Sequence, residues 1–200
     1  MPLNVRTFEN MIKIVADKLI ASLALLFLSP LYVYLMLRVK TSSEGSIFFK
    51  QERIGQHGHP FLIYKFRTMH PNAEQQGPTL ASLQDPRITP LGRTMRRYHL
   101  DELPQFWNVL KGDMTLVGPR PERQFYIDRI VKQAPEFQQL LELRPGITSL
   151  GMIKYGYASN VEQMIERMQY DKWYYDHLST TLDLKILVET VKITLSGNGV

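Results

Sequence analysis

Two adjacent carboxylates, Asp101 and Glu102, stand at the edge of an apolar segment in the stretch RRYHLDELPQFWNVLKGDM, residues 96–114. Pro104 suits the first turn of a helix and Gly112 suits its end, so a helix is predicted with the carboxylates at or just before its N-terminus. In one interpretation, either carboxylate simply caps that helix. In the other, an ionised carboxylate attacks phosphorus while its neighbour holds a divalent cation through oxygen.

Basic residues that could bind phosphate surround this pair in the sequence. Lys65 and Arg67 lie two residues apart in YKFRTM, so on a strand they would share one face. Arg96 lies one to two turns before the pair. Arg120 and Arg144 stand in the proline-containing loops VGPRPER and LRPGITS, which lose little entropy when they clamp an anion. Each is an ordinary surface cation when taken singly, but together they indicate a phosphate site.

The longest apolar run is Leu19–Leu37, 19 residues without a charge. A helix of this length reaches about 28 Å, enough to cross a bilayer core. Ser29-Pro30 lies in its middle and predicts a break, and cations flank the run on both sides, which favours both ends on one face of a membrane. On these grounds a re-entrant helix and a spanning helix are equally balanced. A cleaved signal peptide fits less well, because no small-residue cleavage site follows the run. A buried helix of a soluble protein also fits less well, because the run lacks the polar positions that surface helices show.

The composition sets broad limits. A chain of 200 residues fits one domain with an appendage, and the absence of cysteine excludes disulfides and thiolate-metal sites. The formal charge of +5 suits an anionic partner such as phosphate, a nucleotide or an acidic membrane surface.

Local patterns predict an α+β fold that is mostly helical. Residues 45–69 read as a small β-hairpin, and residues 91–100 as a short basic helix. Residues 71–90 form a long loop rich in proline and glycine. Two further helices follow after residue 159, the first with a stripe of apolar residues at helical spacing that indicates packing rather than a cofactor site. Met11–Lys18 is amphipathic and could lie at a membrane interface.

Four motifs in this order, YKFRTM, LDELPQFWNVLKGDMTLVGPRP, RPGIT and YDKWYY…LDLKI, follow the hydrophobic helix broken at Ser-Pro. With them the chain resembles the bacterial sugar transferases, the monotopic phosphoglycosyl transferases that act on polyprenol phosphate, in their minimal single-domain form. The resemblance covers nearly the whole chain from about Lys13. It implies a re-entrant membrane helix within residues 1–40, interfacial amphipathic helices and a catalytic domain at 41–200 on the cytoplasmic face of the bacterial inner membrane.

The resemblance also implies a reaction. A sugar 1-phosphate would move from a nucleotide diphosphate sugar, usually UDP-linked, to polyprenol phosphate, with release of UMP and the start of glycoconjugate or exopolysaccharide assembly. Asp101 matches the family's nucleophile, which forms a covalent phospho-sugar intermediate. Glu102 completes the Asp-Glu pair and is tied to the required Mg²⁺. Arg96 and Arg120 match basic residues near the site.

Other positions carry over with less detail. Lys65 and Arg67 match the YKFRTM strand, Ser29-Pro30 matches the break of the family's re-entrant helix, and Asp171 and Asp183 match acidic positions of the C-terminal motif as secondary candidates for the metal site. The expected partners are a UDP-sugar, polyprenol phosphate and the lipid bilayer, with no nucleic acid. A homodimer and contact with downstream glycosyltransferases stay open.

The chain departs from the family after RPGIT, where Ser149 and Met152 occupy positions at which the family commonly has Gly and Gln. The sugar is therefore not predicted. Two rival functions remain: a Mg²⁺-dependent membrane phosphatase or pyrophosphatase that uses the same carboxylates, and a non-catalytic membrane anchor that binds anionic lipid or nucleic acid.

Overall fold

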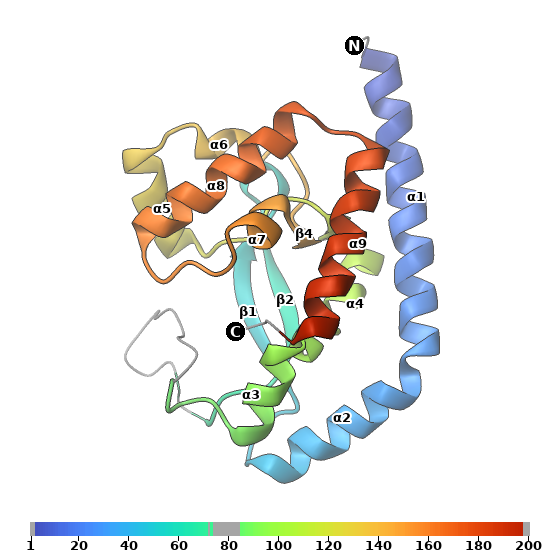
Figure 1. Cartoon of the computed structure of the whole chain (residues 1–200), viewed down its shortest axis with the longest axis vertical. Coiled ribbons are helices and arrows are strands. Elements are labelled where there is room, and N and C mark those ends of the chain that lie inside the picture. Colours follow the sequence, from blue (N-terminus) through green and yellow to red (C-terminus); the bar gives the residue numbers. More distant parts are fainter. Residues whose placement is uncertain (1–2, 72, 74–84, 198–200) are drawn as a thin grey trace.

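The computed structural model describes residues 3–71, 73 and 85–197. It is an α+β fold in which long helices surround two small sheets (Figure 1), as predicted. The elements in chain order are α1 (Leu3–Phe27), α2 (Ser29–Ser42), β1 (Phe48–Ile54), η1 (Gln56–Gly58), β2 (Pro60–Phe66), α3 (Pro90–Arg97), η2 (Leu100–Glu102), α4 (Gln105–Lys111), β3 (Thr115–Val117), α5 (Gln124–Gln133), α6 (Phe137–Leu140), β4 (Gly146–Thr148), α7 (Leu150–Lys154), α8 (Val161–Asp176) and α9 (Thr180–Ser196).

The two sheets bring distant parts of the chain together. Strands β1 and β2 form the predicted antiparallel hairpin, in which Lys65 pairs with Phe49. Strands β3 and β4 pair in parallel, with Thr115 opposite Gly146. Most of the predicted loop at residues 71–90 lies outside the described residues, apart from its two ends.

Helices α1 and α2 meet at the predicted break. α1 ends at Phe27 and α2 begins at Ser29 with Pro30 in its first turn, where the missing proline N–H costs no helical hydrogen bond. Within the described residues no single helix has the length and hydropathy of a membrane span, whereas Met11–Phe27 and Ser29–Ser42 reach them together, bent by 64°. Large apolar side chains stay exposed on both sides of the bend, including Leu26, Phe27 and Leu37.

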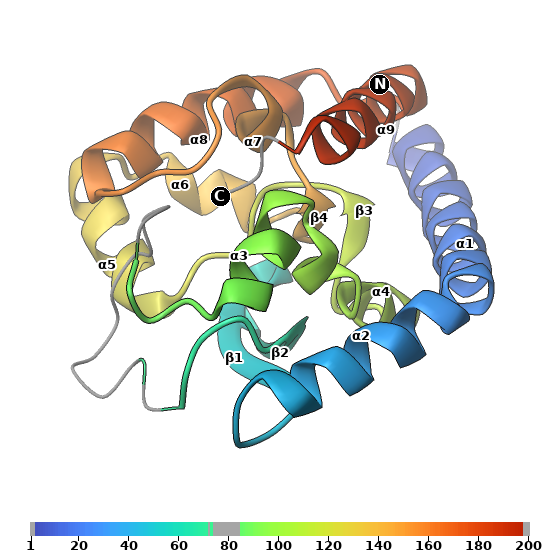
Figure 2. The same ribbon diagram turned by 60° about the horizontal axis from the view of Figure 1, so that its bottom comes forward.

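The first half of α1 also packs against the rest of the protein. Its Asp17, only 8 % exposed, accepts hydrogen bonds from the Thr115 hydroxyl and the Leu116 N–H on β3. Lys13 Nζ lies 2.5 Å from Asp183 Oδ2 at the start of α9. Helix α9 runs beside α1 in both views (Figures 1 and 2). One face of Met11–Lys18 is thus bonded to the sheet and to α9, while apolar residues on the opposite face remain exposed.

Apolar side chains form three buried clusters that hold these elements together. Met164 and Met168 of α8 belong to the first, so the apolar stripe on this helix is packing, as predicted. The second surrounds β3 and β4 and includes Ala21 of α1. In the third, Leu35 and Val39 of α2 pack against the hairpin and α3. The bent helix pair is therefore joined to the core on either side of its bend.

Replacing Asp17 with Ala should destabilise the protein by about 1–3 kcal/mol, because the Thr115 hydroxyl and the Leu116 N–H would then be buried without an acceptor. Thermal unfolding of the protein in detergent or nanodiscs measures this. Asp128→Ala, at an exposed position of α5, is the matched control and should change the melting temperature little. Equal melting temperatures for the two variants would contradict the assigned role of Asp17.

Candidate active site

The two adjacent carboxylates lie in the single turn η2, directly before α4. Asp101 and Glu102 are only 5 % and 8 % exposed, and His99 before the turn has a left-handed backbone with φ 52°. Such a conformation is uncommon for a residue other than glycine and tends to occur at functional sites. The cap residue of α4 is Pro104, and no side chain caps this helix. The interpretation of Asp101 or Glu102 as a helix cap is therefore wrong, although the predicted helix and its end at the left-handed Gly112 are confirmed.

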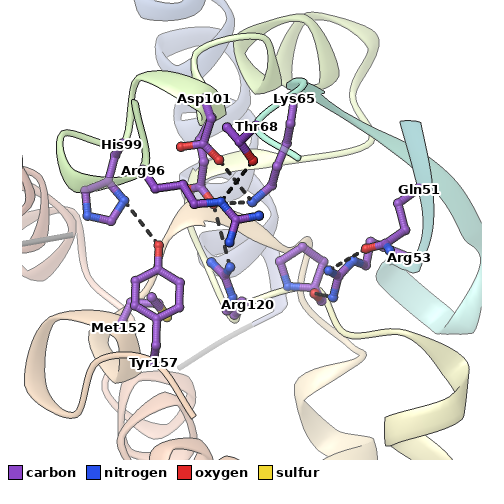
Figure 3. Close-up of polar contacts among 12 residues, drawn as sticks. Gln51, Arg53, Lys65, Thr68, Arg96, His99, Asp101, Arg120, Met152 and Tyr157 are labelled. Carbon is purple, nitrogen blue, oxygen red and sulfur yellow. Dashed lines mark hydrogen bonds and ion pairs between the residues drawn. The ribbon is translucent and has the colours of Figure 1, made fainter. Parts of the chain in front are cut away.

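Two partly buried cations compensate the carboxylates (Figure 3). Lys65 Nζ on β2 lies 2.5 Å from Glu102 Oε1 and 4.0 Å from Asp101 Oδ2. Arg120 Nη2, in the loop after β3, lies 3.6 Å from the same Glu102 oxygen. Glu102 thus takes the close contacts of both cations, and the Asp101 carboxylate is held more loosely.

The same asymmetry governs the ionisation of the pair. Burial is the largest influence on both groups and by itself raises a carboxylate pKa. For Glu102, Lys65 and Arg120 outweigh it and bring the pKa to about 2. For Asp101, burial and the charge of Glu102 prevail over the attraction of Lys65, so the pKa of Asp101 is raised above its usual value. Glu102 is therefore a permanent anion, and Asp101 is the carboxylate whose charge is less stabilised.

Helix α3 places Arg96 beside the pair. A Cβ on Gly92 would lie 2.1 Å from the Thr68 carbonyl oxygen, so α3 approaches the chain after β2 more closely than any side chain at this position allows. Arg96 Nε then donates to Thr68 Oγ1 over 2.9 Å. The Arg96 guanidinium consequently faces the same region as Lys65 and Asp101 (Figure 3).

A tyrosine completes this side of the site. The Tyr157 hydroxyl lies 3.3 Å from His99 Nδ1, and the Arg120 guanidinium lies over the Tyr157 ring at 5.2 Å from its centre. Burial raises the pKa of Tyr157, so its phenol stays protonated at neutral pH. Thr68, His99 and Tyr157 were not predicted from the sequence. Thr68 and His99 stand within or beside the predicted motifs, but nothing in the local sequence marks Tyr157.

Thr68, Arg96, Arg120 and Tyr157 line a cavity of about 570 Å³. Asp101 faces this cavity, and so does a large set of cationic side chains: Arg53, Lys65, Arg67, Arg87, Arg96, Arg120, Arg123 and Arg167. Glu122 is the other carboxylate among the described lining residues. The cavity has the size and the charge to bind a substrate with several phosphate oxygens.

Arg67 lines the cavity, but its guanidinium donates hydrogen bonds to backbone carbonyls outside the carboxylate pair. Its guanidinium donates to the backbone carbonyls of Ser46, Val39 and Ser43, the last two at the end of α2. The strand β2 ends at Phe66, one residue before Arg67, so the predicted alternation that would place Arg67 on the face of Lys65 does not extend to it. Arg67 therefore binds the end of α2 from the wall of the cavity, and its predicted contact with a phosphate stays a prediction.

Three other predicted residues lie away from the pair. Arg144 lines a second cavity of about 190 Å³ between α1 and α9. Asp171 is buried on α8, where it accepts from the Gly151 N–H over 2.8 Å, and burial raises its pKa to about 6. Asp183 pairs with Lys13 and accepts from the Tyr174 hydroxyl. Among the described residues no three acidic or histidine side chains gather into a metal site, so the structure does not bring Asp171 or Asp183 together with Glu102.

Comparison with known proteins agrees with the motifs around this site. The family model described as "Bacterial sugar transferase" matches residues 8–197. The chain is 38 % identical over 183 residues to a UDP-N-acetylgalactosamine-undecaprenyl-phosphate N-acetylgalactosaminephosphotransferase of Aeromonas hydrophila, covering 92 % of this chain and 43 % of that protein. It is 38 % identical over 195 residues to a UDP-glucose:undecaprenyl-phosphate glucose-1-phosphate transferase of Caulobacter vibrioides, covering 96 % and 72 %.

A third relative is a shorter protein. The uncharacterized sugar transferase EpsL of Bacillus subtilis is 41 % identical over 171 residues, covering 85 % of this chain and 79 % of EpsL. The chain thus spans less than half of the Aeromonas protein and most of the other two. The family model matches almost the full length of this chain, with the buried Asp-Glu pair near the middle of the match, which shows that the chain belongs to the bacterial sugar transferase family.

Proposed function

We propose that the protein transfers a sugar 1-phosphate from a UDP-sugar to polyprenol phosphate through a covalent phospho-sugar intermediate on Asp101. The observation that carries this proposal is the position of Asp101, a buried carboxylate that faces a cavity whose charged lining residues are mostly lysine and arginine. The named activities of the Aeromonas and Caulobacter relatives support the two substrates.

Asp101 suits the nucleophile better than Glu102 does. Lys65 and Arg120 stabilise the negative charge of Glu102, and a strongly stabilised anion is a poor nucleophile. Asp101 has a raised pKa and a more distant cation, so its carboxylate oxygen is more basic than those of Glu102.

The reaction balances in two displacements. In the first, an Asp101 oxygen bonds to the phosphorus that carries the sugar, the bond from that phosphorus to the bridging oxygen breaks, and UMP leaves with the electron pair. In the second, an oxygen of polyprenol phosphate attacks the same phosphorus and the Asp101 carboxylate leaves. Arg96, Arg120 and Lys65 surround the reacting phosphate and stabilise charge on its oxygens.

We also propose that Mg²⁺ binds at the pair. Magnesium in proteins commonly takes one or two carboxylates together with substrate phosphates and water, and adjacent Asp101 and Glu102 fit this mode without a third protein ligand. Glu102, which stays ionised, would be the principal ligand. When bound, the ion neutralises charge on the diphosphate of the substrate.

The bent helix pair supports a re-entrant membrane anchor, with the catalytic part on the cytoplasmic face of the bacterial inner membrane. The bend of 64°, the exposed apolar side chains on either side of it, and cations at both flanks agree with entry and exit on one face. Such an anchor keeps the site at headgroup height, where the phosphate of a membrane lipid can reach Asp101.

The isosteric change Asp101→Asn removes the nucleophile and should abolish both turnover and the phospho-sugar adduct, a loss of at least about 10³-fold. Polyprenol-dependent UMP release and intact-protein mass after incubation with UDP-sugars measure the two effects. Asp176→Asn, at an exposed position of α8, is the control and should keep both. Full activity in Asp101→Asn would favour the membrane-anchor alternative, and free sugar phosphate as the main product would favour a phosphatase.

Replacing Lys65 with Gln should shift the acid limb of adduct formation to higher pH. The raised pKa of Asp101 means that the inactive, protonated form persists to higher pH than for an ordinary aspartate, and Lys65 is the main group that opposes this shift. Removing the charge of Lys65 raises the pKa of Asp101 further. The rate of adduct formation therefore falls more at low pH than at high pH. Single-turnover rates across pH measure it. Lys65→Arg keeps the charge and should retain the wild-type limb, and identical limbs in all three proteins would contradict the assignment.

The topology of the anchor can be read by cysteine labelling, because the chain has no cysteine of its own. Single cysteines at Lys18 and Lys40, on the two sides of the bend, should react from the same side with a membrane-impermeant maleimide. A cysteine at Asp176 marks the side of the catalytic part. Labelling of the first two positions from opposite sides would show a true span.

A further inference from the structure

One end of the active-site cavity holds two arginines that share a single carboxylate. Glu122, in the loop before α5, is 4 % exposed and bonds Arg167 Nη2 of α8 through Oε1. Arg53 Nη1 of β1 lies 3.5 Å from the other oxygen, Glu122 Oε2. All three residues line the cavity, so this cluster carries one uncompensated positive charge at the cavity wall. Burial lowers the pKa of Arg53 to about 10, and the negative charge of Glu122 opposes this shift.

Both arginines have an N–H that lacks a good acceptor. Arg53 Nη1 and Nη2 donate to the Pro121 carbonyl and to Gln51 Oε1, but the buried Arg53 Nε has no acceptor among the described residues. Arg167 is only 5 % exposed, and the acceptor found for its Nη1 is the thioether of Met152, 3.9 Å away. A thioether is a weak acceptor. Buried donors left in this state need an acceptor that the protein does not supply, such as water or an oxygen of a bound molecule.

The cluster adjoins the reacting centre through Arg120. Arg120 lies two residues before Glu122 in the chain, and its guanidinium contacts Glu102. The sugar of the donor is joined through one oxygen to the phosphorus that Asp101 would attack, so it lies next to the groups that hold this phosphate. Lys65, Arg120 and the cluster line the same cavity, which places the cluster among the groups available to the sugar.

The two ends of the cavity differ in character. The cluster end is enclosed by buried side chains, with Glu122 and Arg167 beside Met164 and Ala158, and it presents charged donors that suit hydroxyl and carbonyl oxygens. Away from the cluster, Phe49 lies four residues before Arg53 on β1, and the chain after β2 also lines the cavity. These parts present ring and apolar surfaces that suit a flat base: Phe49, Met69, His70 and Pro71.

We infer that the Arg53–Glu122–Arg167 cluster binds hydroxyl or acyl carbonyl oxygens of the sugar ring of the donor, and that Met152 helps to set sugar preference by leaving Arg167 Nη1 available. This inference rests on the proposed transfer reaction. Met152 of α7 is a positioning residue, since it contacts Arg167 and acts through it. Glu122 fixes the guanidinium of Arg167 by the other nitrogen, and the weak thioether contact holds Nη1 without satisfying it.

The test is Met152→Gln, which keeps the length of the side chain and adds an amide oxygen able to accept from Arg167 Nη1. Met152→Leu is the matched control, because it has similar volume and offers no oxygen. Full-length protein in nanodiscs with polyprenol phosphate is assayed by UMP release on UDP-glucose, UDP-galactose and their N-acetylamino counterparts. Thermal unfolding checks that all variants are folded, and inhibition by UMP reports the nucleotide end of the cavity.

Met152→Gln should lower kcat/KM for the preferred donor by roughly tenfold, mainly through KM, and lower it less for the poorer donors, so that the range of preference narrows. Met152→Leu should keep the wild-type ranking, and inhibition by UMP should be the same in all three proteins. An unchanged ranking in Met152→Gln would overturn the inference. So would an equal loss for every donor accompanied by weaker UMP inhibition, which would assign this end to the nucleotide. A wild-type protein that releases UMP from none of the donors would instead overturn the transfer reaction itself.

Discussion

The arrangement of this protein depends on the burial of two adjacent negative charges. Desolvation of a carboxylate is unfavourable by several kcal/mol, and a second carboxylate next to it adds repulsion, so Asp101 and Glu102 require cations at close range. Lys65 comes from the hairpin and Arg120 from the loop after β3, and neither reaches the pair unless both sheets pack on the turn that carries it. Lys65 and Arg120 contact Glu102 more closely than Asp101, so the negative charge of Glu102 is stabilised more than that of Asp101.

The local features of the chain could be predicted from its sequence, because short-range rules determine them. Proline and glycine define the break at Ser29-Pro30 and the end of α4 at Gly112, and β-forming residues define the hairpin. Features that depend on tertiary packing could not be predicted in this way. The period of a strand places Lys65 and Arg67 on one face, yet the strand stops between them and only Lys65 meets the pair.

The contacts that complete the site escape sequence analysis for a similar reason. Arg96 reaches Thr68 across 28 residues and Tyr157 reaches His99 across 58, and such distant pairs carry no periodic signal. Asp171 and Asp183 illustrate the converse, since their motif suggested a metal while their partners are a backbone N–H, a tyrosine and a lysine. Charge and spacing identified candidate ligands, and only the fold shows which of them share a site.

Arg67 connects the bent helix pair to the two buried carboxylates. Its guanidinium grips the last carbonyls of α2, and two residues earlier the same backbone carries Lys65, whose amine holds Glu102. A change in the tilt of α2 therefore displaces the lysine that balances the carboxylates. If α1 and α2 form the proposed membrane anchor, the thickness and lateral pressure of the bilayer would influence the electrostatics of a site that no lipid chain needs to touch.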